Sequence, residues 1–220
     1  MTEKKKEFID FMLRSDVLRF GEFKTKSGRL SPYFINTGNY RTGSQISTLG
    51  DYYAELVHTT LGDNFDAMFG PAYKGIPLAA ATAAMLYKNY GIDKNYFFNR
   101  KEQKDHGEGG DLVGYKPVDN DSVIIIEDVI TAGTAVRETL PILKSAANVL
   151  VKDMFISVNR MEIGQNGKTA TEEIKESFGI DVHAIITVKD IYEYLKEKHT
   201  EESDTMCGKM ESYMSQYCIL

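Results

Sequence analysis

From residue 44 onward the chain alternates between helical and strand patterns, and this alternation limits the possible folds more than any other feature. Helices are predicted at about 44–61, 75–89, 134–146, 170–178 and 189–197. Strands are predicted at 66–69, 96–99, 122–127, 150–158 and 182–187. Strands separated by helices are typical of βαβ units, so we predict an α/β fold whose central, mainly parallel sheet is flanked by helices. The run Val123–Ile126 is typical of a buried central strand.

The flanking segments complete this scheme. A helix over residues 4–14 and two short strands at Leu18–Phe23 and Tyr33–Ile35 predict a small N-terminal unit. Apolar residues at three- and four-residue steps predict a terminal helix at about 200–218, and Arg100–Asn120 is polar and glycine-rich and is predicted to be a long loop. A length of 220 residues suits a single domain over 1–220.

Composition excludes several classes of function. The chain has 26 Lys and Arg against 32 Asp and Glu, a net charge of −6, which argues against general affinity for nucleic acid or anionic membranes. The longest nearly apolar stretch, Leu78–Leu86, is far shorter than the ~20 residues that span a bilayer. The N-terminus lacks the apolar run of a secretory signal, so a cytoplasmic location is expected.

The segment 123–135 carries the strongest chemical signal. An apolar strand ends in two adjacent carboxylates, Glu127 and Asp128, and a loop of small and hydroxylic residues then begins a helix. In parallel sheets ligands bind beyond the carboxyl ends of strands, and a helix N-terminus suits a phosphate. Carboxylates beside a phosphate site are suited to ribose hydroxyls, which donate to them. The alternative is an acidic strand end that merely caps the following helix.

This pattern resembles the fingerprint of the type I phosphoribosyltransferases, which bind 5-phosphoribosyl 1-diphosphate. The resemblance implies the type I phosphoribosyltransferase fold, with a core at about 44–198 and a small hood at about 1–43 plus part of 160–170. It implies that the acids bind the ribose hydroxyls and that the loop binds the 5-phosphate. The loop residues concerned are Val129, Ile130, Thr131, Ala132, Gly133, Thr134 and Ala135.

Three further segments, 26–36, 69–77 and 99–110, are similar to those of the orotate phosphoribosyltransferases, and the similarity runs in order over about 8–195. The resemblance implies transfer of the phosphoribosyl group to orotate in UMP biosynthesis. It implies diphosphate contacts from Tyr73, Lys74, Arg100, Lys101, Lys104 and His106, with Lys26 also at the donor and with Lys101, Lys26 and Asp128 catalytic. It also implies a homodimer in which Arg100 and Lys104 reach the neighbouring site.

The base site follows from the same resemblance. Arg160 could pair with a planar carboxylate in bidentate fashion, and orotate carries one. Phe34, Ile35 and Thr131 match the other orotate contacts. Mg²⁺ is expected as a cofactor carried mainly by the diphosphate, without a dedicated set of protein ligands.

Two residues depart from the common pattern. Ile35 stands where a second aromatic is usual, and Glu127 stands where Asp is usual. The alternatives are a phosphoribosyltransferase for another base and a non-catalytic regulator that senses the ribose donor. The regulator should lack the cationic loop residues and should bind nucleic acid through a basic face, whereas this chain has the loop and is acidic.

Overall fold

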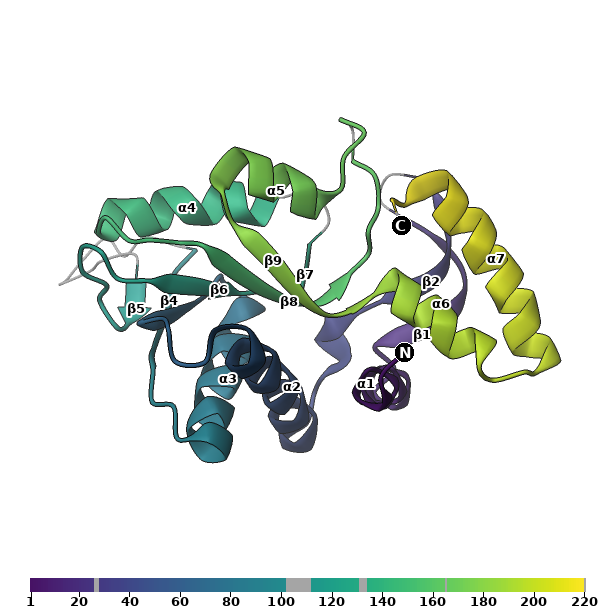
Figure 1. Cartoon of the computed structure of the whole chain (residues 1–220), viewed down its shortest axis with the longest axis horizontal. Helices are drawn as coiled ribbons and strands as arrows, with labels where there is room; N and C mark the ends of the chain where they lie inside the picture. Colours follow the sequence, from purple (N-terminus) through teal and green to yellow (C-terminus); the bar gives the residue numbers. More distant parts are fainter. Residues whose placement is uncertain (26–27, 102–111, 131–133, 165, 220) are drawn as a thin grey trace.

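The structure is a computed structural model, and it describes residues 1–25, 28–101, 112–130, 134–164 and 166–219. Figure 1 shows a central sheet with helices on both faces and a smaller group of elements at one end of it. This arrangement confirms the predicted α/β class and the mainly parallel sheet.

Within the described residues seven strands form the sheet, in the order β5-β4-β3-β6-β8, with β7 and β9 also paired to β8. All pairs are parallel except β4 with β5. The strands are β3 Ala67–Gly70, β4 Asn95–Asn99, β5 Leu112–Gly114, β6 Val123–Ile126, β7 Val129–Ile130, β8 Asp153–Asn159 and β9 Asp181–Thr187. The strand β6 lies between β3 and β8, as expected for its unbroken apolar run.

Helices cover the two faces of the sheet in pairs (Figure 1). One face carries α2 Gly43–Leu61 and α3 Gly75–Tyr90, and the other carries α4 Thr134–Ala146 and α5 Ala170–Phe178. Successive residues of β6 point to opposite faces, so Ile124 and Ile126 join the core under α2 and α3, whereas Ile125 joins the core under α4 and α5. The strand is therefore buried on both faces.

The N-terminal and C-terminal segments form the group at the end of the sheet. It consists of α1 Glu3–Arg14, the hairpin β1 Leu18–Lys24 and β2 Leu30–Ile35, the 3₁₀ turn η1 Thr37–Asn39, α6 Val188–Lys196 and α7 Glu201–Tyr217. The hairpin is a separate two-stranded antiparallel sheet. The helix α7 lies against it (Figure 1), and their buried side chains belong to the same core as those of α1 and α2.

Local sequence explains where several helices begin. Threonine is the N-cap of α2, α5, α6 and α7, and each of these helices has a capping box. In a capping box the threonine side chain accepts a hydrogen bond from the backbone N–H of the third helical residue. The side chain of that third residue accepts one from the backbone N–H of the threonine. No helix among the described residues is long and apolar enough to cross a membrane.

Two expectations need correction. Residues 100–120 were expected to be loop, but Leu112–Gly114 form the edge strand β5, paired antiparallel to β4. Its three residues are too few to show an alternating pattern. The strand predicted at 150–158 begins at Asp153 and ends at Asn159, because Leu150 makes only an isolated bridge to Ser122.

Candidate active site

The carboxyl ends of four parallel strands meet at one edge of the sheet, and several of the predicted substrate-binding residues that the structure describes lie there. The strand β3 leads into the loop 71–74, β4 into Arg100, β6 into Glu127 and Asp128, and β8 into Arg160. This edge is where open parallel sheets bind their ligands. The topology therefore brings together residues that are far apart in the sequence.

Glu127 and Asp128 are held within the sheet rather than in a free loop. The strands β6 and β7, on either side of them, pair with β8 in an unbroken register. The Glu127 N–H donates to the Phe155 carbonyl at 3.0 Å, and the N–H and hydroxyl of Ser157 both donate to the Asp128 carbonyl, at 2.9 and 2.7 Å. The buried Tyr53 hydroxyl of α2 donates to the Glu127 carbonyl at 2.6 Å. The backbone that carries both acids is thus fixed from two sides.

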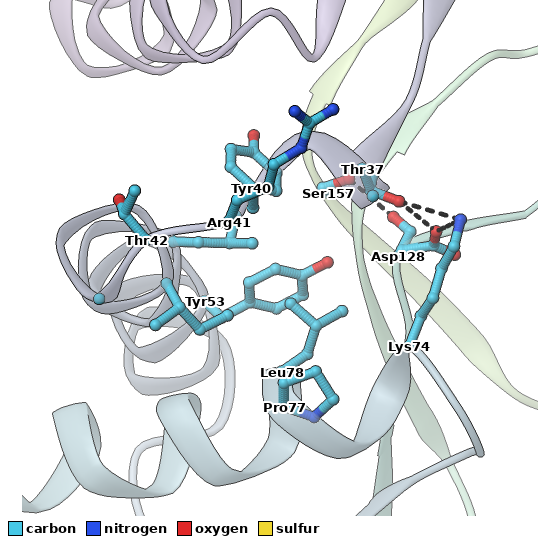
Figure 2. A pocket seen from close by; sticks show the side chains of 14 residues that line it. Thr37, Tyr40, Arg41, Thr42, Tyr53, Lys74, Pro77, Leu78, Asp128 and Ser157 are labelled. Atoms are coloured by element: carbon cyan, nitrogen blue, oxygen red, sulfur yellow. Dashed lines mark hydrogen bonds and ion pairs between the residues drawn. The ribbon is translucent and has the colours of Figure 1, made fainter.

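The Asp128 carboxylate is the point where the N-terminal segment meets the sheet edge (Figure 2). Its Oδ2 accepts from the Thr37 hydroxyl at 2.6 Å and from Lys74 Nζ at 2.9 Å, and Lys74 Nζ lies 3.1 Å from the same hydroxyl. Its Oδ1 accepts from the Val129 N–H at 2.7 Å. The Asp128 side chain is 14% exposed and that of Lys74 is 58% exposed, so this ion pair is open to solvent on the lysine side.

The two adjacent acids have opposite shifts in pKa. Burial raises the pKa of Glu127 to about 7, because the charged form loses its hydration. Burial would also raise the pKa of Asp128, but hydrogen bonds from Thr37 and Lys74 outweigh it and hold that pKa below its ordinary value. Near neutral pH the pair therefore consists of a charged Asp128 and a Glu127 close to its titration point.

The loop 71–74 is folded tightly against the ends of β3 and β6. A Cβ on Gly75 would lie 2.6 Å from Pro71 Cδ and 2.9 Å from the Ile126 carbonyl oxygen, so only glycine fits. The Ala72 N–H donates to the Asn99 side chain at 2.8 Å, and the peptide bond between Ala72 and Tyr73 is cis. This packing leaves the tip of the loop facing outward.

The side chains at that tip are exposed. Tyr73 is 64% exposed, and Lys101 Nζ lies 5.2 Å from its ring centroid. The ammonium of Lys74 reaches Asp128 at the surface. Tyr73, Lys74 and Lys101 thus present two cations and a phenol to solvent beside the acids.

A cavity of about 400 Å³ opens beside Asp128 and Lys74 (Figure 2). Its polar side carries these two groups with Thr37 and Ser157, and its floor is formed by the ring of Tyr53 and by apolar side chains of α2 and α3. The remaining lining residues are Gly38, Tyr40, Arg41, Thr42, Gly43, Ile46, Leu49, Pro77 and Leu78. A sugar-sized ligand can therefore meet a carboxylate and an ammonium at one side of a largely apolar hollow.

Arg160 is largely buried beside the hairpin. Its side chain is 14% exposed, and its guanidinium carbon lies 4.8 Å from the ring centroid of Tyr33. Its Nε donates to Glu162 Oε1 at 2.8 Å, and its Nη2 lies 2.6 Å from the same oxygen. Next to Tyr33 on β2, Phe34 is 43% exposed and stacks on Phe23 with ring centroids 5.4 Å apart. Ile35 is partly buried against the main core.

The remaining predicted residues fall into two groups. Arg100 is exposed at the end of β4, and Thr134 and Ala135 begin α4. Val129 and Ile130 were expected in the loop, which is wrong, because they form the strand β7 and pair with β8. Lys26, Lys104, His106, Thr131, Ala132 and Gly133 lie outside the described residues.

The sequence reading missed four residues of this edge: Thr37, Tyr53, Ser157 and Glu162. Thr37 is 91 residues from its partner Asp128, and Tyr53 is 74 residues from Glu127, so no local pattern marks either contact. Glu162 stands two residues after Arg160, and that spacing was the one signal that could have suggested the pair.

Comparison with known proteins agrees with this geometry. The phosphoribosyl transferase domain family matches residues 37–152. An orotate phosphoribosyltransferase of Clostridium beijerinckii is 51% identical over 217 residues, which cover 97% of each chain. The crystal structure of orotate phosphoribosyltransferase from Francisella tularensis has a TM-score of 0.86 and 42% identity, and it covers 97% of this chain and 100% of that one.

A more distant structure supports the fold assignment only. The Mycobacterium tuberculosis orotate phosphoribosyltransferase, in complex with 5-phospho-alpha-D-ribosyl 1-diphosphate, has a TM-score of 0.61 at 18% identity and covers 86% of this chain and 98% of that one.

Proposed function

Because the chain belongs to the orotate phosphoribosyltransferases, within the phosphoribosyl transferase domain family, we propose how its own residues carry out that reaction. The protein transfers the 5-phosphoribosyl group to orotate, giving orotidine 5′-monophosphate and diphosphate, in pyrimidine biosynthesis. The bond from ribose C1 to the diphosphate oxygen breaks, with its electrons leaving on the diphosphate. A bond from N1 of orotate to C1 forms, and the N1 proton is released.

One observation supports the donor site above others, namely the Asp128 carboxylate at the carboxyl end of β6, with Lys74 at 2.9 Å and the cavity beside it. Asp128 and Glu127 accept hydrogen bonds from the ribose hydroxyls. The segment 129–135, which runs from β7 to the start of α4, binds the 5-phosphate through N–H groups that follow β7 and through the positive end of the helix dipole. The donor then lies across the sheet edge with its diphosphate toward Lys74.

The diphosphate is bound by the cations at the tip of the loop 71–74 and after β4. Tyr73 and Lys101 are exposed at this edge, and the ammonium of Lys74 is exposed on one side while Asp128 holds it on the other, so all three can contact an anion. Charge develops on the diphosphate as it leaves, and cationic donors aimed there stabilise the transition state. Lys101 provides the largest part of this stabilisation. Lys26, Lys104 and His106 complete the site in the same proposal.

Orotate binds on the other side of the ribose. Phe34 offers an exposed aromatic face, Ile35 and Thr131 provide further contacts, and the guanidinium of Arg160 pairs with the orotate carboxylate. The burial of Arg160 supports this role, because a buried guanidinium binds an anion more strongly than a hydrated one does.

Mg²⁺ fits this donor set as a companion of the diphosphate. The described residues contain two adjacent carboxylates at the site and no group of three or more His, Cys, Asp or Glu arranged to hold a metal ion. Mg²⁺ is commonly bound through one or two carboxylates, substrate phosphates and water. When bound, it neutralises charge on the leaving diphosphate.

The assembly and location are part of the same proposal. We infer a cytoplasmic homodimer in which Arg100 and Lys104 of each subunit reach the donor site of the other. The exposure of Arg100 at the end of β4 supports this arrangement. The hood comprises 1–43 with part of 160–170, supported by the separate hairpin sheet and by the hydrogen bond from Arg29 to the Ile163 carbonyl at 3.3 Å.

The test is turnover with defined substrates. The purified protein is mixed with orotate, 5-phosphoribosyl 1-diphosphate and Mg²⁺, and loss of orotate absorbance is followed. Uracil, adenine and hypoxanthine replace orotate in parallel reactions. We expect rapid turnover with orotate only. Turnover of another base in place of orotate would instead support a transferase for that base, and donor binding without any turnover would support a regulator.

A further inference from the structure

The C-terminal helix α7 touches the base-binding side of the site through a single carboxylate. Glu162 Oε1 accepts from Arg160 Nε at 2.8 Å and from the Tyr213 hydroxyl of α7 at 2.7 Å. The Tyr33 hydroxyl of the hairpin donates to the same oxygen at 3.4 Å. The rings of Tyr33 and Tyr213 pack edge to face, with centroids 6.0 Å apart. One oxygen therefore joins β2, α7 and the segment after β8.

The backbone is joined at the same place. The Ile163 N–H donates to the Tyr217 carbonyl at 2.8 Å, and the Ile219 N–H donates to the Met161 carbonyl at 3.0 Å. These bonds flank an antiparallel bridge between Glu162 and Cys218. The segment after Arg160 and the end of α7 are thus held together by backbone hydrogen bonds of the antiparallel β type.

Because of its geometry, the Arg160 guanidinium takes its orientation from this attachment. A guanidinium has five N–H donors in a rigid planar fork, so two contacts along one edge fix the direction of the others. Glu162 accepts a hydrogen bond from Nε and lies within ion-pair distance of Nη2, and the ring of Tyr33 lies against the guanidinium carbon. Nη2 itself is buried without a hydrogen-bond partner among the described residues, so one donor of the fork remains for a ligand. Burial and the bond to Glu162 raise the pKa of Tyr213 to about 12, so its hydroxyl keeps its proton and remains a donor at neutral pH.

We propose that Tyr213 and Glu162 are positioning residues for orotate, which hold the guanidinium of Arg160 in the orientation that receives the orotate carboxylate. This inference rests on the proposed role of Arg160 in base binding. It assigns to α7, which lies outside the residues matched by the domain family, a specific part in choosing a carboxylated base. Donor binding is not expected to depend on this contact.

The first test is Tyr213→Phe, which removes the hydroxyl and keeps the ring that packs on Tyr33. We expect KM for orotate to rise about fivefold, the effect of losing one hydrogen bond of ~1 kcal/mol, with kcat and KM for the donor within twofold of wild type. Glu162→Gln should raise KM for orotate by about tenfold or more, since it also removes the charge that faces Arg160.

The matched control is Tyr192→Phe. Tyr192 of α6 also donates its hydroxyl to a glutamate, Glu211 of α7, but this contact is not part of the Arg160 network. Its removal should leave both KM values unchanged. If Tyr213→Phe behaves like this control, or if it raises both KM values equally, the positioning role is refuted.

A double substitution separates this inference from the proposed function. Arg160→Gln alone should raise KM for orotate strongly, and if it does not, the assignment of Arg160 to the base site fails. In the Arg160→Gln background, Tyr213→Phe should add nothing, because residues that act through one another are not additive. A further fivefold rise in that background would show that Tyr213 acts by another route and would overturn the inference.

Discussion

The substitution Asp128→Asn tests the centre of the donor site, because it removes a charge and changes the side-chain volume very little. Three hydrogen bonds end on this carboxylate, from Thr37, Lys74 and Val129. An amide keeps one acceptor oxygen, so part of this network survives in the variant. What is lost is the charge that strengthens each bond.

The size of the effect follows from the strength of charge-assisted bonds. A hydrogen bond to a charged group contributes roughly 1.5–3 kcal/mol, against roughly 0.5–1.5 kcal/mol for a neutral one, so each ribose hydroxyl bound by Asp128 loses about 1–1.5 kcal/mol. If Asp128 binds one ribose hydroxyl, donor affinity should fall about tenfold, and if it binds two, about a hundredfold. Lys74 is 58% exposed, so its ion pair adds less than about 1 kcal/mol to folding stability.

Two measurements check this reasoning. Calorimetric titration with 5-phosphoribosyl 1-diphosphate and Mg²⁺ gives the donor affinity, and urea unfolding gives the free energy of unfolding. The control is Asp121→Asn at the other end of β6, where the carboxylate accepts from Tyr115 and from the Val118 N–H, each at 2.9 Å. A donor affinity of Asp128→Asn within twofold of wild type would refute the assignment of the ribose to this acid.

Three further predictions concern neighbouring residues. Glu127 has a pKa of about 7 in the folded protein, against 4.5 for an ordinary glutamate. Between these two pH values the folded state keeps a proton that the unfolded state releases. The free energy of unfolding should therefore fall by up to roughly 3 kcal/mol as pH rises from about 4.5 to 7. Urea unfolding of Glu127→Gln should lack this fall, and identical pH profiles would contradict the prediction. Lys101→Ala should lower kcat by about 10²–10³, and near-normal turnover would exclude its role at the leaving group. Gly75→Ala should lower the free energy of unfolding by ~1–3 kcal/mol, measured by thermal unfolding, and should weaken donor binding, because the new Cβ meets Pro71 and Ile126. The control is Gly208→Ala, which should be neutral or stabilising, because no atom lies within 4 Å of a Cβ at that position.

The sequence predicted the sheet well because its strands carry their own signals. Val123–Ile126 is apolar throughout and is buried at the centre of the sheet, and the two acids that follow it lie at the expected edge. The strand predicted at 66–69 and the helix predicted at 75–89 placed a loop between them correctly. They gave no measure of the exposure of Lys74, since exposure depends on which way the loop tip turns. That direction is decided by Asp128, 54 residues away.

The contacts that complete the site could not be predicted because they join distant segments. Thr37 follows an unremarkable short strand, and only the folded chain brings its hydroxyl to Asp128. Tyr213 was read correctly as part of a terminal helix, but the partner of its hydroxyl is 51 residues away on Glu162. Helix and strand periodicity report which face of an element is buried, and they do not report which polar atom it meets.

Two of the charged groups proposed to hold the substrates, Asp128 and Arg160, share one physical feature: each already has partners in the folded chain. Asp128 has Thr37 and Lys74, and Arg160 has Glu162 and Tyr33. Burying a charge without a partner costs several kcal/mol, so these contacts offset that cost during folding. The substrates therefore meet charges whose positions are already fixed, and less of the binding free energy is lost to ordering side chains. Because the partners of both charges include residues 33–37 of the N-terminal segment, that segment should affect the binding of donor and base together.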